Sequence, residues 1–281
     1  MTPENLTGPV CVHAEAPVWS PSWGGVRWVD GEAADLVTLR GDGIHRLHLD
    51  DDYAAFVRPR ASGGFAAFGT RTLHLSDSAD GPAAPALRFD LGSARFNDGT
   101  VDPHGRLLAG SMATDDAGAV GRVIRLTAEL EQREVLSGVE VSNGIGFAPD
   151  GDLAYYVDTT TGGVDVFDVI DGELTGRRRF VGIPDDQGMP DGLTVAADGS
   201  VWVALWNGWA VHGYSPEGAL IARIPLPVPQ VSACAFGGDD LGTLFITTSA
   251  QGLDRDHGTE AGSLFAVRPG VQGLPVLPFA G

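Results

Sequence analysis

Short apolar runs, separated by glycine-containing turns, recur along the chain with the pattern of β-hairpins. Each clear unit is a polar residue followed by glycine, an apolar strand, an Asp-Gly or equivalent turn, and a second apolar strand. The leading glycines of the three clearest units are Gly99, Gly144 and Gly192, spaced by 45 and 48 residues. Residues 127–136 contain good helix formers, but they lie between two strand-like runs, so a helix is the less favoured interpretation there.

Three weaker copies of the same unit complete the series. One begins near Pro17, one at residues 64–68 and one at residues 233–236, which gives six units of about 47 residues in a chain of 281. A repeat of this length built from several strands is typical of a propeller blade. The sequence therefore predicts an all-β protein, a six-bladed β-propeller with four antiparallel strands per blade, as a single domain over residues 1–281.

The composition limits the classes of partner. The chain has 18 Lys and Arg against 37 Asp and Glu, a formal net charge of -19. A polyanion such as nucleic acid or an anionic membrane would be repelled, so we expect neither as a partner. Every basic residue is arginine, which excludes a Schiff-base lysine, a phosphate-loop lysine and a Ser-Lys dyad.

The remaining composition points to a cytoplasmic protein. Cys11 and Cys234 are too few for a disulfide framework, and the first residues lack the basic and apolar regions of a signal peptide. No apolar run approaches the roughly 18 residues of a membrane span. We expect a cytoplasmic monomer or weak homo-oligomer.

The repeat also brings polar residues to one place. In a propeller the innermost strands surround a central channel, so equivalent positions at their starts converge on one mouth. The residues before the leading glycines are Asp98, Asn143 and Asp191, and Glu15 holds about the same place in the first unit. Unpaired carboxylates at close range repel each other unless a cation is present. This pattern predicts one divalent metal ion held by oxygen ligands, although any single Asp-Gly or Asn-Gly pair is more often simple turn chemistry.

Other chemistries find little support. The seven histidines are scattered, no Ser-containing nucleophile elbow or dinucleotide fingerprint occurs, and Cys234 lies in an apolar strand typical of a core residue. Trp202, Trp206 and Trp209 are assigned mainly to packing between blades, with a place for Trp206 or Trp209 at the channel mouth as the less favoured alternative.

The chain resembles the regucalcin (senescence marker protein), gluconolactonase and luciferin-regenerating enzyme family over nearly its whole length. Four stretches carry the resemblance, and a fifth near Phe236 matches the last blade; the four are residues 15–19 (EAPVW), 95–99 (RFNDG), 142–145 (SNGI) and 189–193 (MPDGL). The resemblance implies a six-bladed propeller with one divalent metal on its axis, calcium first, with zinc, magnesium and manganese as alternatives.

Carried over residue by residue, the resemblance implies that Glu15, Asn143 and Asp191 ligate the metal. It also implies that Arg95 binds the substrate and that Asn97 lies beside the metal as a ligand or substrate contact. It favours Asn97 over Asp98 as the inward residue of the third unit, so the contribution of Asp98 stays open. Residues 113–120 (ATDDAGAV) differ from the corresponding substrate-side segment of regucalcin, so the identity of the substrate stays open too.

The implied activity is hydrolysis of a sugar lactone. The metal would polarise the lactone carbonyl, water would attack it, and Asp191 would act as catalytic base. Two alternatives remain: a phosphotriesterase-like metal hydrolase on the same scaffold, and a non-catalytic calcium-binding propeller.

Overall fold

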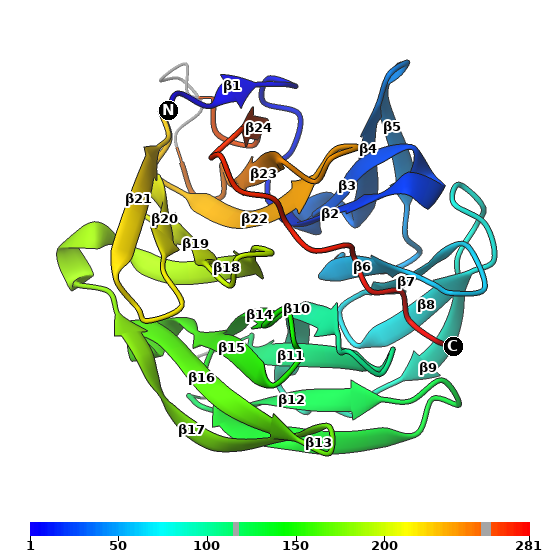
Figure 1. The fold of residues 1–281 in the computed structure, drawn as a ribbon. Helices are drawn as coiled ribbons and strands as arrows, with labels where there is room; N and C mark the ends of the chain where they lie inside the picture. Colours follow the sequence, from blue (N-terminus) through cyan, green and yellow to red (C-terminus); the bar gives the residue numbers. More distant parts are fainter. Residues whose placement is uncertain (115–117, 254–259) are drawn as a thin grey trace.

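The hairpins of the sequence pair into six four-stranded antiparallel sheets in a computed structural model of the protein. The structure describes residues 1–114, 118–253 and 260–281. The six sheets stand as blades around a central axis (Figure 1), as the repeat predicts. Among the described residues no helix is long and apolar enough to cross a bilayer.

Each of the first three blades is a meander whose first strand lies next to the axis. Blade 1 comprises β2 (Ala14–Ser20), β3 (Gly25–Asp30), β4 (Asp35–Arg40) and β5 (Gly43–His48). Blade 2 comprises β6 (Phe56–Pro59), β7 (Phe65–Phe68), β8 (Thr72–Ser76) and β9 (Ala84–Arg88). Blade 3 comprises β10 (Ala94–Val101), β11 (Leu107–Ala113), β12 (Gly121–Leu126) and β13 (Gln132–Val139).

The next two blades repeat this order, and the sixth is completed from the other end of the chain. Blade 4 comprises β14 (Ser142–Phe147), β15 (Leu153–Asp158), β16 (Gly163–Ile170) and β17 (Glu173–Gly182). Blade 5 comprises β18 (Met189–Val195), β19 (Val201–Trp206), β20 (Ala210–Tyr214) and β21 (Leu220–Pro225). Blade 6 comprises β22 (Val231–Gly237), β23 (Thr243–Thr248), β24 (Leu264–Val267) and the N-terminal strand β1 (Glu4–Asn5). Short 3-10 turns occur at η1 (Pro21–Trp23), η2 (Gly31–Ala33), η3 (Thr159–Thr161) and η4 (Asp185–Gln187).

The first strands of the blades form a closed inner ring. Around the axis β2 contacts β6, β6 contacts β10, β10 contacts β14, β14 contacts β18, β18 contacts β22, and β22 returns to β2. The ring is joined where β1 pairs with β24, through Glu4 opposite Ala266 and Asn5 opposite Phe265. A strand of two residues has no hydrophobic pattern of its own, so the sequence did not reveal this pairing.

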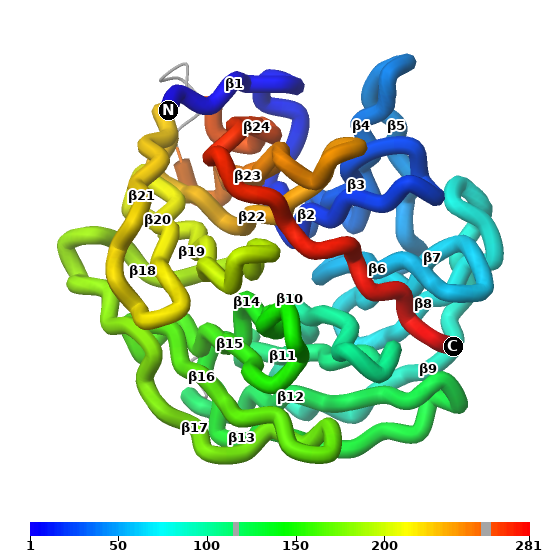
Figure 2. The backbone as a smooth tube through the Cα atoms, in the orientation of Figure 1, coloured from blue at the N-terminus to red at the C-terminus, as the bar shows by residue number. Residues whose placement is uncertain are grey.

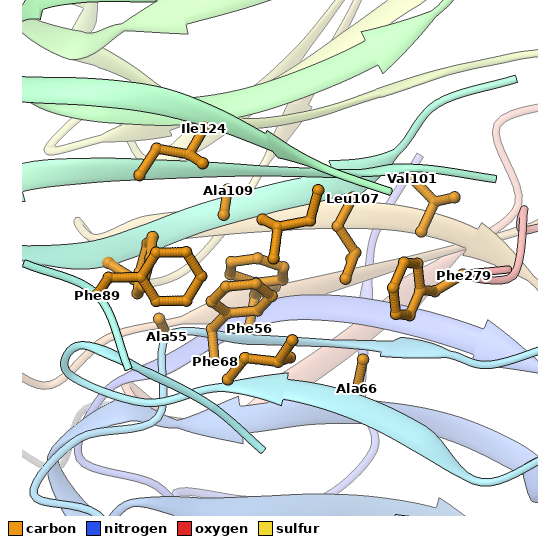
Figure 3. Close-up of a cluster of buried hydrophobic side chains, with 14 of the residues drawn as sticks. Ala55, Phe56, Ala66, Phe68, Phe89, Val101, Leu107, Ala109, Ile124 and Phe279 are labelled. Atoms are coloured by element: carbon orange, nitrogen blue, oxygen red, sulfur yellow. The ribbon is translucent and has the colours of Figure 1, made fainter. Parts of the chain in front are cut away.

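The core lies between neighbouring blades, where the faces of adjacent sheets meet. Figure 3 shows the cluster between blades 2 and 3. Within this cluster Phe68 of blade 2 meets Phe96 of blade 3 edge to face, with ring centroids 4.8 Å apart. Phe279, from the end of the chain, is fully buried in the same cluster. Interlocking aromatic side chains of this kind fix the position of one blade against the next.

The last residues of the chain cross the ring from blade 6 to blade 2, a path clear in Figure 2 as the red tube. We call residues 273–279 the C-terminal strap. Gly273 donates its backbone N–H to the carbonyl of Leu241 at 2.8 Å, and Phe279 donates to the carbonyl of Pro59 at 2.8 Å. The strap is thus attached to two sheets that do not adjoin each other.

One part of the predicted register is wrong. The sequence places residues 64–68 as the leading strand of their unit, but β7 (Phe65–Phe68) is the second strand of blade 2 and β6 is the innermost one. The inner strand β6 lacks the polar residue and glycine that mark the other units. Residues 127–136 contain no helix: a turn leads from β12 directly into β13.

Candidate metal and substrate site

A β-bulge interrupts four of the inner strands at the position of the repeated polar motif. The ladder of β10 skips from Phe96 to Gly99, that of β14 from Ser142 to Ile145, and that of β18 from Pro190 to Leu193. In β2 the ladder skips from Glu15 to Val18. A bulge opposes two residues to one and turns a side chain out of the regular alternation. The motif residues therefore leave the blade packing at the same depth in the channel.

The glycines of the motif serve close packing rather than hairpin turns. A Cβ on Gly144 would lie 2.4 Å from the backbone nitrogen of Leu193 in the next blade. A Cβ on Gly192 would lie 2.4 Å from the Cβ of Ala233 in the blade after that. Only glycine lets the inner strands approach so closely, which tightens the ring around the axis.

Buried aspartates fix the starts of two inner strands. Asp30, at the end of β3, accepts hydrogen bonds from the backbone N–H groups of Val12 and His13, both at 3.1 Å. Asp158, at the end of β15, accepts from the N–H groups of Glu140 at 3.2 Å and Val141 at 2.9 Å. The repeated contact holds the residues that lead into the bulges in one geometry.

The structure brings Glu15 and Asp191 into electrostatic contact although they lie far apart in the chain. Burial, the carboxylate of Glu15 and that of Asp98 raise the pKa of Asp191 well above its ordinary value. Burial and the carboxylate of Asp98 also raise the pKa of Glu15, although a hydrogen bond from the N–H of Ala16 and the charge of Arg95 oppose this. These electrostatic influences indicate that the carboxylates of Glu15, Asp98 and Asp191 lie near one another.

The donor atoms of this group suit a hard divalent cation. In the described part of the chain, Asp191 Oδ1 is buried and has no hydrogen-bond partner, an arrangement that is costly without a cation. Asn143 donates through Nδ2 to Thr159 Oγ1 at 2.9 Å, and Thr159 donates to the carbonyl of Pro190 at 2.9 Å. The Asn143 amide oxygen remains as an acceptor, and Pro190 directly precedes Asp191.

The group mixes carboxylates with an amide. Among residues 1–114, 118–253 and 260–281 there is no set of three or more His, Cys, Asp or Glu side chains spaced to hold a metal ion. Glu15, Asn143 and Asp191 are two carboxylates and one amide, a donor set of the type that calcium and magnesium accept.

Arg95 and Asn97 lie next to each other at the mouth. Arg95 donates from one guanidinium nitrogen to the carbonyl of Phe96 at 2.8 Å and to Asn97 Oδ1 at 2.9 Å. Asn97 in turn donates to the carbonyl of Ser142 at 2.9 Å, which ties blade 3 to blade 4. Arg95 therefore has no carboxylate partner of its own within hydrogen-bond reach in the described residues, in contrast to a surface ion pair.

Asp98 lies on the other side of the bulge. It accepts a hydrogen bond from the N–H of Gly99 at 2.7 Å, and its carboxylate is 3.7 Å from a guanidinium nitrogen of Arg58. Burial raises the pKa of Asp98, while Arg58 opposes the change. Both Asn97 and Asp98 reach the channel because the bulge contains both, Asn97 beside Arg95 and Asp98 beside Arg58.

Three aromatic side chains lie together at the mouth, and two of them, His13 and Tyr53, were missed from the sequence. The guanidinium of Arg95 lies 4.1 Å from the ring centroid of Tyr53, and His13 lies 6.4 Å from Tyr53 and 5.9 Å from Trp206, ring to ring. Trp206, for which the channel mouth was the less favoured alternative, contacts this group. His13 carried a usable signal, its place two residues before Glu15 in a strand. Tyr53 lies in the connection between β5 and β6 and carried no signal.

A separate apolar chamber lies beyond the bulges, at the opposite end of the channel. Its volume is about 420 Å³ and the strap covers it. Its walls are the later residues of the inner strands, with the pair Arg58 and Asp98 at the side of the bulges and mainly apolar groups elsewhere, including Val18, Ile145, Phe147, Leu193, Val195, Phe236, Leu274 and Val276. None of the candidate metal or substrate residues Glu15, Arg95, Asn97, Asn143 and Asp191 lines it.

The segment 113–120, whose role the sequence left open, is placed in part. Ala113 ends β11 and Thr114 bonds to the carbonyl of Ser93, while residues 115–117 lie outside the described residues.

Comparison with known proteins gives consistent results. Residues 13–250 match the family model described as SMP-30/Gluconolactonase/LRE-like region. The chain is 33% identical to the pentonolactonase XacC of Haloferax volcanii, with 98% of this chain and 97% of the relative covered. It is 32% identical to regucalcin of Sus scrofa, with 96% of each chain covered. A crystal structure described as a calcium-binding protein, regucalcin, from Agrobacterium tumefaciens superposes with a TM-score of 0.90 at 25% identity, covering 96% of this chain and 95% of that one.

Proposed function

Because the chain belongs to the SMP-30/gluconolactonase/LRE-like family, we propose that it is a metal-dependent lactonase that opens sugar lactones. The observation that carries the proposal is the buried, unpartnered Asp191 oxygen in electrostatic contact with Glu15. A protein that used this channel only for packing would be expected to pair or replace such a carboxylate. The similarity to a pentonolactonase supports a lactone as the substrate class.

Glu15, Asn143 and Asp191 would hold one divalent cation, with calcium as the first choice. When bound, the cation supplies Lewis acidity toward the lactone carbonyl oxygen. The two carboxylates balance the charge of the dication, so the site as a whole is close to neutral. The raised pKa values of Glu15 and Asp191 agree with this need for a cation, because two buried negative charges are unfavourable without a positive one.

The chain's own groups then have separate tasks. Arg95 offers guanidinium donors that its bonds to Phe96 and Asn97 leave unused, and it binds substrate hydroxyls or the carbonyl. Asn97 fixes the orientation of Arg95 from the side of the metal. Asp191 Oδ1 takes a proton from the attacking water, as a general base. Water adds to the carbonyl carbon, the ring C–O bond breaks, the ring oxygen receives the proton, and the hydroxy acid ionises with release of one proton.

That released proton gives the test. A pH-indicator assay measures hydrolysis of xylono-1,4-lactone and glucono-1,5-lactone by the protein as purified, after chelator, and after return of each metal. We expect turnover that chelator abolishes and metal restores, and that Asp191→Asn removes. Asp150→Asn, at a hairpin turn, is the matched control and should retain activity.

The other outcomes are equally informative. Fast turnover that is insensitive to both chelator and Asp191→Asn would exclude the proposed metal chemistry. Calcium binding without hydrolysis of any lactone would support the non-catalytic propeller. A phosphotriester hydrolysed faster than every lactone would support the second hydrolase candidate.

A further inference from the structure

Four side chains form a continuous arc at the mouth of the channel. Arg95 stacks on Tyr53 at 4.1 Å from its ring centroid, Tyr53 lies 6.4 Å from His13, and His13 meets Trp206 edge to face at 5.9 Å. We call Tyr53, His13 and Trp206 the aromatic wall. They come from the β5–β6 connection, the entry to β2 and the end of β19, so the wall joins blades 5, 1 and 2 and reaches blade 3 at Arg95.

The arc lies one layer outward from the candidate metal ligands. His13 precedes Glu15 by two residues, and Arg95 precedes Asn97 by two, so each pair lies on one face of its strand where the strand is regular. Trp206 pairs across the ladder with Met189, which precedes Asp191 by two. The charges of Glu15 and Asp191 both act on the Tyr53 hydroxyl. The aromatic wall therefore lies next to the candidate metal ligands.

Tyr53 is held firmly between two groups. A Cβ on Gly31 would lie 2.8 Å from its ring, so glycine there is what allows the phenol edge to pack against the backbone. The opposite neighbour is the guanidinium of Arg95. His13 is fixed in turn through Nδ1, 2.8 Å from Ser249 Oγ, and by the hydrogen bond of its N–H to Asp30.

We propose that Tyr53 is a positioning residue for Arg95, supported by His13 and Trp206 of the aromatic wall. The inference rests on the proposed function and adds a residue that orients its substrate-binding group. A sugar lactone has hydroxyls that accept from a guanidinium, so the orientation of Arg95 decides how well the ring is held. An unsubstituted lactone offers no hydroxyls, so the polar groups of the site would stay unpaired, which is a strong source of discrimination.

The role of Tyr53 follows from the geometry of Arg95. Two hydrogen bonds, to Phe96 and Asn97, leave from a single guanidinium nitrogen, so they act as a pivot. Stacking on Tyr53 fixes the plane that turns about that pivot. Loss of the ring would let the guanidinium rotate, whereas loss of the phenol oxygen alone would not.

The decisive comparison is Tyr53→Leu against Tyr53→Phe. We expect Tyr53→Leu to raise KM for xylono-1,4-lactone about tenfold with kcat changed less than about twofold. Its preference for xylono-1,4-lactone over γ-butyrolactone should fall by a similar factor, and Tyr53→Phe should match the unmodified protein in both. Tyr214→Leu, a buried tyrosine bonded to His212 in blade 5, is the control for a purely structural loss.

A binding measurement separates this inference from the proposed function. Calorimetric titration with 1,4-anhydroxylitol, a cyclic polyol with no bond to hydrolyse, reports recognition alone. If the protein binds it and Tyr53→Leu weakens binding, the inference holds even where no lactone is hydrolysed. Equal affinity in the two proteins, or equal KM and equal selectivity, would overturn it.

A second variant covers the case in which Tyr53→Leu does not fold. Trp206→Leu changes the same wall from another strand, and we expect it to weaken binding of 1,4-anhydroxylitol about fivefold. Unchanged binding and unchanged selectivity in Trp206→Leu would overturn the role of the wall.

Discussion

The two ends of the central channel are built from the same strands and differ in almost every physical property. At the mouth, Glu15 and Asp191 repel each other, an Asp191 oxygen is unpartnered, and Arg95 has unused donors. At the far end the walls are mainly apolar, the ion pair of Arg58 and Asp98 is internal, and the strap covers the hollow.

The boundary between the two ends is the layer of bulges. At the bulges, β2, β10, β14 and β18 present polar side chains, including the unpartnered oxygen of Asp191. Beyond the bulges, the same strands line the chamber mainly with apolar side chains. Size alone would select the chamber as the functional site. The buried Asp191 oxygen without a partner indicates the mouth instead. This is the better guide, because buried polar groups without partners are costly to keep.

The largest expected effect comes from exchanging one carboxylate at each end. Asp191→Asn should lower kcat/KM roughly a thousandfold, because it removes both a proposed metal ligand and the proposed proton acceptor. Asp98→Asn should retain activity within about tenfold but lower Tm, because it leaves the guanidinium of Arg58 buried without its partner. Initial rates and thermal unfolding of both variants check this, and equal loss of activity would abolish the distinction between the two ends.

Removal of the metal should destabilise the protein, and this effect should depend on the residues at the mouth and not on those at the far end. A ligand present at a hundred times its Kd stabilises the folded state by about 2.7 kcal/mol. Calorimetry with calcium and with chelator should therefore show a Tm shift that Glu15→Gln removes and Asp98→Asn keeps. A shift that persists in Glu15→Gln would place the ion elsewhere.

The free energy of unfolding of the metal-free protein should also depend on pH through the carboxylates at the mouth. Glu15 and Asp191 have raised pKa values in the folded state, so the folded state binds their protons more tightly than the unfolded state. Their contribution to stability is present below the ordinary carboxyl pKa and is lost as pH rises toward the folded-state values. Chemical unfolding in chelator should give a free energy that falls between about pH 5 and about pH 8, less so in Asp191→Asn. A profile that is the same in both proteins would contradict the repulsion between Glu15 and Asp191.

The smallest effect is expected inside the chamber. Thr194 lies three residues after Asp191 in β18 and lines the apolar hollow. Thr194→Leu should fill part of that space, raise the free energy of unfolding by about 1 kcal/mol and leave kcat/KM within about twofold. Urea unfolding and lactone hydrolysis measure the two quantities. A large loss of activity would show that the chamber belongs to the site.

Much of the fold was predictable because the bulge motif repeats. A polar residue followed by glycine marks β10, β14 and β18, since each strand needs glycine to approach its neighbour and a polar group for the channel. Because β6 has no such pair, the pattern wrongly predicted the second strand of blade 2 as its first. The pairing of β1 with β24 joins residues from opposite ends of the chain, and no local sequence pattern predicts it.

The candidate site residues were proposed on the same basis. Glu15, Asn143 and Asp191 were proposed from the motif and the resemblance, and their roles as ligands remain predictions. Tyr53 was out of reach, because a tyrosine in an irregular connection gains its role only from the fold, which places it against Gly31 and Arg95. The inward order of Asn97 and Asp98 depended on the bulge, which breaks the period of two on which the repeat argument relied.

The strap gives the molecule a mechanical asymmetry. A propeller held only by contacts between adjacent blades can separate at its weakest interface. Here Gly273 is tied to Leu241 and Phe279 to Pro59, and the aromatic ring of Phe279 is locked into the interior of the opposite flank. The C-terminal segment is therefore a cross-link between blades 6 and 2, and it opposes their separation at the face that it covers.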